Sequence, residues 1–315
     1  MKYFTTVNDV ADANDLVHEA LQWKHSPFAS PDIGRNKVLG LIFFNASLRT
    51  RMSTQRAAMN LGMTCMVMNI GNEGWALEFH DGAVMNGKTV EHIRDAAAVM
   101  GLYCDIIGVR CFPTLIDKQA DYSESVLLQF MKYSRAPLIS LESATLHPLQ
   151  SLADIMTIRE CVDVKQPKVV LTWAPHMKPL PQVVANSFAE WALHCDYKLT
   201  ITQPAGYELC EDFTRGADIE YDQEKALKDA DVVYVKNWSA YNAYGDMPSV
   251  EQNWMLNDEK MKLTSQAKLM HCMPVRRNLE VPDALLDNAY SLIMKQAENR
   301  IYAAQAVLFR MLQTI

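Results

Sequence analysis

The chain has 315 residues, which at about 150 residues per domain predicts two domains. Hydrophobic residues make up 49% of it and charged residues 21%, a globular composition that excludes collagen-like and disordered chains. The formal net charge of -7 argues against broad binding to nucleic acid or to anionic membranes, but a small anionic ligand needs only local positive charge.

The sequence carries neither an export signal nor a metal motif. No stretch approaches the roughly 18 consecutive apolar residues of a membrane span, and the first residues lack the apolar core of a signal peptide. The 7 cysteines are odd in number and never spaced as C-x-x-C, so neither a disulfide framework nor a zinc site is indicated. We therefore expect a cytoplasmic protein.

Apolar positions with a helical period open the chain at 9–24, where Asn8 and Asp9 are candidate N-caps. Near-continuous apolar runs, typical of buried parallel strands, then alternate with helical patterns. Strands are expected at 38–44, 65–70, 104–109, 137–141, 168–173, 197–202, 231–235 and 267–271, and further helices at 52–61, 88–101, 122–134, 149–162, 181–194 and 298–313. This alternation predicts two α/β units with doubly wound parallel sheets, joined by the helix at 149–162.

The first group of candidate site residues follows the strand expected at 38–44. Its sequence is Ser47-Leu48-Arg49-Thr50-Arg51, at a strand-to-helix junction where an open α/β sheet binds ligands. Hydroxyl groups and helix N-terminal N–H groups bind phosphate oxygens, and arginines supply positive charge. The alternative is a solvated basic helix start. The segment lacks the nucleotide P-loop pattern. No G-x-G-x-x-G follows a strand either, which argues against the interpretation as a dinucleotide-dependent dehydrogenase.

Two more strand ends carry polar side chains. His147 and Gln150 follow the strand at 137–141, where a histidine can donate to a developing oxyanion and a glutamine can accept from a planar amide. A structural histidine at a helix N-terminus explains the same pattern. Cys272 and Arg276 follow the strand at 267–271, and a buried cysteine ending a strand is usually part of the core.

Taken together, these segments resemble the transcarbamylases. S-L-R-T-R at 47–51, H-P-L-Q at 147–150 and H-C-M-P at 271–274 are similar to that family's S-T-R-T-R, H-P-x-Q and H-C-L-P motifs, in the same order and over essentially the whole chain. The resemblance implies a carbamoyl-phosphate-binding domain, 1–147 with 297–315, and an amino-acid-binding domain, 148–296. It also implies a homotrimer with shared active sites and no metal or organic cofactor.

The resemblance implies roles for single residues as well. Carbamoyl phosphate would be bound by Ser47, Leu48, Arg49, Thr50, Trp75, Arg110, His147, Gln150, Met273 and Arg300. Trp75 would contribute to the active site of a neighbouring subunit. Arg49, Thr50, Arg110, His147 and Cys272 would be catalytic. Arginines and helix N–H groups would stabilise the tetrahedral oxyanion and the departing phosphate.

The amine acceptor is indicated by the end of the strand at 231–235. Lys236 stands where ornithine enzymes of the family have an aspartate, and their S-M-G loop is absent. A lysine repels a free α-ammonium group and attracts a carboxylate. This departure resembles the N-acylornithine transcarbamylases, in which the acylornithine would contact Val90, Glu142, His176, Lys236, Cys272 and Arg276.

The proline-rich segment 173–181 resembles a loop that forms a knot in that subfamily, although a rigid surface loop has the same composition. Val90 stands near the position where the acetyl enzymes tend to have a glutamate, and Lys88 is close by, so the local charge favours a succinyl group. We expect transfer of the carbamoyl group of carbamoyl phosphate to the δ-amine of N-succinyl-L-ornithine, giving N-succinyl-L-citrulline and phosphate in arginine biosynthesis. N-acetyl-L-ornithine is the alternative acceptor, and a non-catalytic anion-binding homologue is a more distant alternative.

Overall fold

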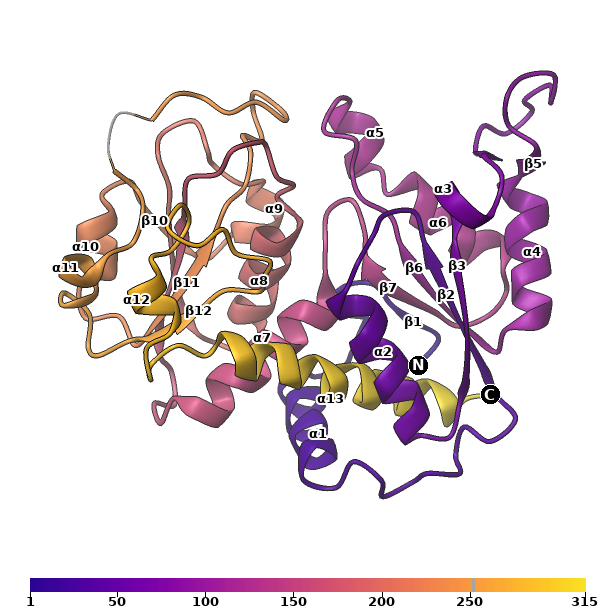
Figure 1. The fold of residues 1–315 in the computed structure, drawn as a ribbon, viewed down its shortest axis with the longest axis horizontal. Coiled ribbons are helices and arrows are strands. Elements are labelled where there is room, and N and C mark those ends of the chain that lie inside the picture. Colours follow the sequence, from indigo (N-terminus) through magenta and orange to yellow (C-terminus); the bar gives the residue numbers. More distant parts are fainter. Residues whose placement is uncertain (251–252) are drawn as a thin grey trace. The chain divides into compact units, whose positions relative to one another are not determined.

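The computed structural model of the chain describes residues 1–250 and 253–315. The chain divides into two compact units (Figure 1). The first consists of Met1–Thr114, Gln119–Leu149 and Arg300–Ile315, and the second of Leu115–Lys118 and Gln150–Asn299. Residues 115–118 group with the second unit, where the Lys118 ammonium lies 4.4 Å from the ring centroid of Tyr241.

The first unit contains a five-stranded parallel sheet of order β1-β7-β6-β2-β3. Its strands are β1 (Tyr3–Phe4), β2 (Val38–Phe43), β3 (Thr64–Asn69), β6 (Ile106–Arg110) and β7 (Leu138–Glu142), and β4 (Leu77–Glu78) pairs separately with β5 (Glu91–His92). The helices are α1 (Ala13–His25), α2 (Arg49–Asn60), α3 (Ile70–Glu73), α4 (Ile93–Tyr103), α5 (Lys118–Tyr122), α6 (Ser125–Tyr133) and the end of α13 (Ile293–Leu312), with a 3-10 turn at Val7–Asp9. The central strands β6 and β7 are buried on both faces, as expected of near-continuous apolar runs.

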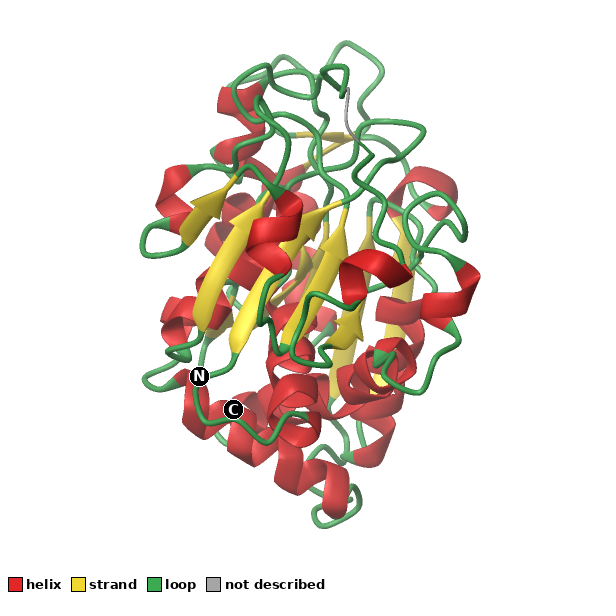
Figure 2. Cartoon of the chain, turned by 90° about the vertical axis from the view of Figure 1, so that its left-hand side faces the viewer, coloured by secondary structure: helices red, strands yellow, loops and turns green. Residues whose placement is uncertain are grey.

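The second unit contains a five-stranded parallel sheet of order β10-β9-β8-β11-β12. Its strands are β8 (Lys168–Trp173), β9 (Lys198–Thr202), β10 (Asp218–Glu220), β11 (Val232–Lys236) and β12 (Lys268–Met270). The helices are α7 (Pro148–Cys161), α8 (Val183–His194), α9 (Glu211–Thr214), α10 (Gln223–Leu227), α11 (Asp258–Met261), α12 (Asp283–Leu286) and the start of α13. Figure 2 shows strand arrows that point the same way, with loops beyond the arrowheads. Residues that follow different strands are therefore brought to one edge of each sheet.

Two local expectations about helix starts are wrong. The helix expected from residue 88 begins only at Ile93, because Glu91 and His92 pair with β4 and the His92 side chain caps the helix. The first helix is capped by Asp12, whose carboxylate accepts from the backbone N–H groups of Asn14 and Asp15. Asp9 is unavailable for that role, since it closes a capping box with Thr6 in the preceding 3-10 turn.

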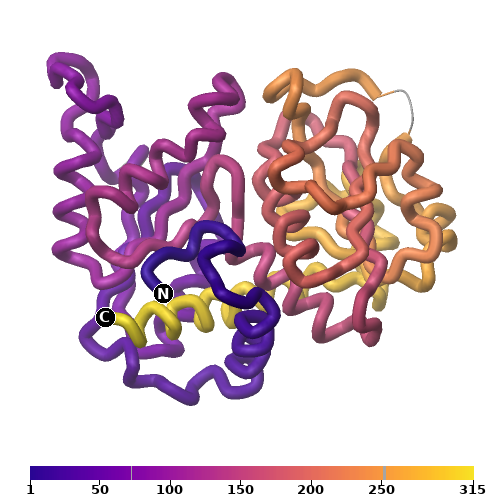
Figure 3. The backbone as a smooth tube through the Cα atoms, turned by 180° about the vertical axis from the view of Figure 1, so that it is seen from behind, coloured from indigo at the N-terminus to yellow at the C-terminus, as the bar shows by residue number. Residues whose placement is uncertain are grey.

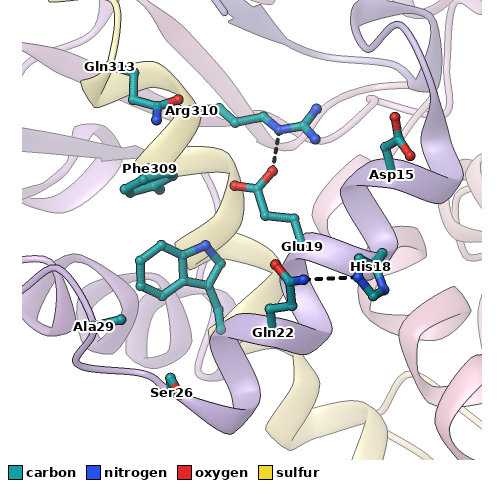
Figure 4. Close-up of a pocket in the computed structure, with 10 residues that line it drawn as sticks. Asp15, His18, Glu19, Gln22, Ser26, Ala29, Phe309, Arg310 and Gln313 are labelled. Carbon is teal, nitrogen blue, oxygen red and sulfur yellow. Dashed lines mark hydrogen bonds and ion pairs between the residues drawn. The ribbon is translucent and has the colours of Figure 1, made fainter.

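The end of α13 packs against α1 within the first unit. Arg310 Nε donates to Glu19 Oε2 at 2.6 Å, and the ring centroids of Trp23 and Phe309 lie 4.8 Å apart. A pocket of about 660 Å³ lies beside this ion pair and contains none of the expected site residues (Figure 4). The two chain ends are side by side (Figure 3), and Thr314 Oγ1 donates to the carbonyl of Met1 at 3.4 Å. No helix within 1–250 or 253–315 is long and apolar enough to span a membrane.

Candidate active site

Buried polar side chains from the strand ends of the first unit form one group around Thr50. Thr50 lies in the first turn of α2, just after β2, and Arg110 ends β6. Thr50 Oγ1 accepts from Arg300 Nη2 at 2.7 Å and from Arg110 Nη1 at 3.4 Å. Because both lone pairs of the hydroxyl oxygen face guanidinium groups, its hydrogen is directed elsewhere and can be donated to a ligand.

His147 is the second member of this group and is only 3% exposed. Burial and the positive charges of Arg300 and Arg110 lower the pKa of His147 well below its ordinary value, so the ring is neutral. Its Nε2 lies 3.5 Å from Arg300 Nη1, which donates, and 3.4 Å from Glu142 Oε2, which accepts, so either ring nitrogen can carry the proton. Among the described residues Nδ1 has no hydrogen-bond partner. The geometry therefore provides a neutral histidine with one buried donor.

Glu142 completes the group from the end of β7. Its carboxylate pairs with Arg110 Nη1, and its Oε2 lies 3.4 Å from His147 Nε2. A buried guanidinium is strongly unfavourable without a counter-charge, and Glu142 supplies one to Arg110. An anion entering this group would compete with Glu142 for Arg110. The structure thus places Glu142, an expected acylornithine contact, with the arginines of the first unit.

The segment before Thr50 forms the N-terminus of α2. Ser47 Oγ accepts from the backbone N–H of Thr50 at 3.2 Å, α2 begins at Arg49, and Leu48 is exposed. Arg51 turns away from this end, because its guanidinium donates to Asn69 and its Cζ lies 4.8 Å from the ring centroid of Phe43. Arg51 therefore joins α2 to the sheet.

Trp75 and Val90 are brought together by β4 and β5, separately from the group around Thr50. Val90 N donates to the carbonyl of Ala76 at 3.0 Å, and Trp75 Nε1 donates to Glu91 Oε2 at 2.8 Å. Trp75 is 55% exposed and Val90 is 65% exposed. Large apolar side chains this exposed are typical of binding or contact surfaces.

In the second unit, charged side chains gather beyond β11 and β12. Lys236 ends β11 and is buried, and Arg276 Nε donates to His176 Nε2 at 3.0 Å. Glu280 lies beneath them: its Oε2 accepts from the backbone N–H of Arg276 at 2.6 Å, and its Oε1 lies 3.7 Å from His271 Nε2. Burial opposes ionisation of Glu280, but the His271 ring and the Lys236 ammonium outweigh it and lower its pKa. Lys236, Arg276 and His176 thus share a region with one buried carboxylate.

A second network in this unit joins Gln150 and Cys272. Gln150 Nε2 donates to Asp154 Oδ1 at 2.7 Å, and the hydroxyl of Tyr234 donates to Asp154 Oδ2 at 2.9 Å. Burial, Asp154 and a hydrogen bond with Cys272 raise the pKa of Tyr234 well above its ordinary value. Gln150 and Cys272, two expected site residues, are therefore connected through Asp154 and Tyr234.

Met273 follows Cys272 with an unusual backbone conformation. Its φ of +53° lies in the left-handed region, which residues with side chains rarely adopt. The backbone N–H of Met273 donates to His271 Nδ1 at 2.9 Å, which fixes this turn. Such strained residues are common where a site requires a particular direction of the backbone.

Several residues in these networks escape the sequence motifs. Asp154 lies four positions after Gln150, so a shared helical face was a detectable signal. Tyr234 lies two positions before Lys236 on the same face of β11, which was detectable in the same way. Glu280 carries no such signal, nor does Gln296, whose Nε2 donates to Asp154 Oδ1 at 2.9 Å, because their partners depend on how distant segments pack.

The neighbouring Arg277, which also follows β12, has a structural role. Arg277 is held by Asp283 and Asp287 at 2.8 Å each, so this arginine braces a surface turn. In the described part of the chain, no three His, Cys, Asp or Glu side chains are arranged as a metal site.

The proline-rich segment is fastened to the chain that follows β11. Ser239 N donates to the carbonyl of Leu180 at 2.8 Å, and Gln182 Nε2 donates to the carbonyl of Ser239 at 2.8 Å. Asn237 Nδ2 also donates to the carbonyl of Ala174. These bonds hold the segment beside Lys236, and the knot itself stays a prediction.

Comparison with known proteins agrees with these features. Residues 2–160 match the carbamoyl-P binding domain of aspartate/ornithine carbamoyltransferase, and residues 181–311 match its Asp/Orn binding domain. N-succinylornithine carbamoyltransferase of Bacteroides thetaiotaomicron is 48% identical over 99% of both chains, and N-acetylornithine carbamoyltransferase of Xylella fastidiosa is 35% identical over 98% of both. A glutamate-to-alanine mutant of N-acetyl-L-ornithine transcarbamylase, complexed with carbamyl phosphate and N-succinyl-L-norvaline, superposes with a TM-score of 0.92 at 34% identity, over 99% of this chain and 100% of that one. The chain therefore belongs to the aspartate/ornithine carbamoyltransferase family and is a carbamoyltransferase.

Proposed function

We propose that this carbamoyltransferase carbamoylates the δ-amine of N-succinyl-L-ornithine. The observation that carries the proposal is Lys236, a buried ammonium at the carboxyl end of β11. The Glu280 carboxylate near it is already engaged by the Arg276 N–H and by His271. The region therefore has positive charge left to bind a further carboxylate, which an N-acylornithine supplies. The free α-ammonium group of ornithine would instead be repelled by Lys236.

Carbamoyl phosphate is assigned to the group around Thr50 in the first unit. Ser47, Leu48, Arg49 and Thr50 at the start of α2 bind the phosphate with hydroxyl and N–H donors and with the positive end of the helix. Arg110 and Arg300 add fixed positive charge. The start of α2 and Arg300 stand in place before the reaction and stabilise the negative charge that grows on the departing phosphate, whereas Arg110 first exchanges Glu142 for the phosphate.

The carbamoyl oxygen is assigned to Thr50 and His147. The Thr50 hydroxyl hydrogen and the single N–H of the neutral His147 ring are assigned to this oxygen as donors. Attack by the neutral δ-amine turns the carbamoyl carbon tetrahedral and its oxygen anionic. Each donor of this kind typically contributes about 100- to 1,000-fold in rate. The pair therefore lowers the free energy of the transition state and does not act on substrate binding alone.

The carbamoyl amide and the acceptor are assigned to the second unit. Gln150 and the backbone around Met273 accept from the carbamoyl NH₂, and Cys272 lies near the δ-amine. Lys236, Arg276 and His176 bind the carboxylates of the acylornithine. From the first unit, Val90 and Glu142 are assigned to the acylornithine as well, and Trp75 to carbamoyl phosphate. An acceptor with two carboxylates matches two cationic side chains better than an acceptor with one.

The succinyl group is favoured over the acetyl group by three further observations. The relative at 48% identity is named N-succinylornithine carbamoyltransferase, whereas the N-acetylornithine relative is 35% identical. The complex of N-acetyl-L-ornithine transcarbamylase with N-succinyl-L-norvaline contains a mutant that has lost one glutamate. Val90 carries no charge and the exposed Lys88 adds a positive one, whereas the adjacent Glu91 carboxylate already accepts from Trp75 Nε1.

The acceptor is tested by supplying carbamoyl phosphate with N-succinylornithine, N-acetylornithine, ornithine or aspartate and measuring the ureido product. We expect kcat/KM for N-succinylornithine to exceed that for N-acetylornithine at least about tenfold, the size of one charge-assisted interaction. Comparable or greater turnover of N-acetylornithine would reassign the enzyme to that acceptor. Turnover of ornithine alone would reject both acyl forms.

We further propose a homotrimer with shared active sites, as the family resemblance implies. The edge strand β3 alternates between partly buried and exposed positions, and its exposed side chains include Met66 and Met68. An uncovered apolar edge strand invites pairing or aggregation, so a second copy of the chain is its natural cover. The exposed Trp75 and Val90 are then free to reach a neighbouring subunit.

Replacing Met66 and Met68 by lysine is expected to dissociate the trimer, because two charges would be buried at the subunit contact. Sedimentation would show a smaller species, and turnover would fall with it if sites are shared, although neither methionine belongs to the proposed site. Met294→Lys changes an equally apolar, exposed residue on α13 and is the matched control. A monomeric double variant with full activity would mean that each subunit holds a complete site.

A further inference from the structure

Asp154 carries a fully buried carboxylate that has no role in the reaction proposed above. It lies one turn after Gln150 on α7 and has 0% of its surface exposed. Its Oδ1 accepts from Gln150 Nε2 at 2.7 Å and from Gln296 Nε2 at 2.9 Å, and its Oδ2 accepts from the Tyr234 hydroxyl at 2.9 Å. A carboxylate is tolerated in such a place only when donors surround it, so the site is built around its charge.

The three donors lead to different parts of the proposed substrate site. Gln150 is itself assigned to the carbamoyl amide. Gln296 Oε1 accepts from the backbone N–H of His271 at 2.8 Å, which fixes the start of the turn that contains Met273. Tyr234 is hydrogen-bonded to Cys272. One carboxylate thus joins α7, β11, α13 and the segment after β12.

The chemistry of the contact decides which end of the Gln150 amide faces the substrate. A side-chain amide has a donating NH₂ and an accepting oxygen, whereas an ionised carboxylate can only accept. Only the NH₂ of Gln150 can therefore face Asp154, and the oxygen is turned to the opposite side. A carbamoyl group offers two N–H donors there, so it needs an acceptor and would be repelled by a second NH₂.

We propose that Asp154 is a positioning residue that orients the Gln150 amide to accept from the carbamoyl NH₂, and so selects carbamoyl phosphate over acyl phosphates of the same shape. The inference rests on the proposed function, since it needs Gln150 at the carbamoyl amide. Asp154 is not a general base in this scheme, because three donors stabilise its charged form.

The test compares carbamoyl phosphate with acetyl phosphate, which has a methyl group in place of the NH₂, and with inorganic phosphate. In Asp154→Asn the new side-chain amide can donate to the Gln150 oxygen. The Gln150 amide can then rotate and present its NH₂ to the substrate. We expect binding of carbamoyl phosphate to weaken about tenfold, the usual size of one well-placed hydrogen bond, while inhibition constants for acetyl phosphate and inorganic phosphate stay within about twofold. A general loss of structure would weaken all three ligands alike.

Two further variants separate positioning from stability. In a Gln150→Leu background, Asp154→Asn should cause no additional loss, because the two residues act as a unit. Thr157→Ala removes another buried hydrogen bond of α7, from Asn299, and should lower the melting temperature without changing the ratio of carbamoyl to acetyl phosphate binding. If Asp154→Asn does not fold, Asp154→Ser, which is smaller and equally unable to enforce the amide orientation, should show the same selective loss.

The outcomes distinguish this inference from the proposed function. Wild-type enzyme that does not turn over carbamoyl phosphate with any acylornithine would reject the function itself. Active wild-type enzyme whose Asp154→Asn variant keeps the wild-type preference for carbamoyl over acetyl phosphate would reject only the positioning role.

Discussion

Replacing Arg49 by alanine is expected to lower kcat/KM for carbamoyl phosphate by more than about 100-fold, the size of losing a preorganised charge at a transition state. Arg49 is the first residue of α2, where the backbone N–H groups and the helix dipole already favour an anion. In the proposed site the guanidinium adds a planar set of donors and a full charge for the phosphate that departs. Removing it therefore weakens binding of the substrate and of the leaving group together.

Arg56→Ala is the matched control, because Arg56 lies on the same helix and is exposed, with its guanidinium 5.8 Å from the ring centroid of Phe28. We expect its kcat/KM to remain within about twofold, since Arg56 lies about 10 Å along α2 from Arg49, where an exposed charge is largely screened. Steady-state rates and competitive inhibition by inorganic phosphate measure both variants. Near-normal activity of Arg49→Ala would remove the assignment of the phosphate to the start of α2.

The strands were the most predictable part of the fold. Buried parallel strands such as β2 and β8 read as continuous apolar runs, and the strands at 38–44 and 168–173 match them closely. The two-residue strand β1 and the short β10 have too few positions to show any period, so they could not be predicted. The helix expected from residue 88 failed for a related reason: a two-residue pairing of β5 with β4 overrides the local helical pattern.

Positive charge was less predictable than apolar pattern. Arg49 and Arg51 look alike in the sequence, yet Arg51 is bound by Asn69 and Phe43. Arg276 and Arg277 are adjacent, yet Arg277 braces the surface turn with Asp283 and Asp287. What distinguishes the members of each pair is the set of acceptors that folding brings from elsewhere, and a sequence does not contain that geometry.

The acceptor half of the site depends most strongly on such distant partners. Lys236 was detectable as a departure from a family pattern, but Glu280, which offsets its charge, lies 44 positions later and has no motif of its own. Glu280 also interacts with His271 and with the Arg276 N–H, so its negative charge offsets the positive charge of Lys236 only in part. A residual positive charge of this kind suits a ligand that arrives with a carboxylate.

Lys236→Met tests that conclusion, because methionine keeps most of the length of the side chain and removes the ammonium charge with its N–H donors. We expect KM for N-succinylornithine to rise about 10- to 100-fold, since a hydrogen bond to a charged group is worth about 1.5–3 kcal/mol, while kcat changes less. The dissociation constant of carbamoyl phosphate, measured without an acceptor, should stay within about twofold. Glu280 retains its other donors, so the variant is expected to fold.

Lys198→Met is the matched control, since Lys198 begins β9 and its side chain is exposed. It should leave both substrates unaffected. The relation between the two acceptors carries the most information: loss of one carboxylate contact affects N-acetylornithine and N-succinylornithine equally if Lys236 binds the α-carboxylate, but affects N-succinylornithine alone if Lys236 binds the succinyl end. An unchanged KM for both in Lys236→Met would contradict any role of this lysine in acceptor binding, and with it the charge argument on which the N-acylornithine specificity rests.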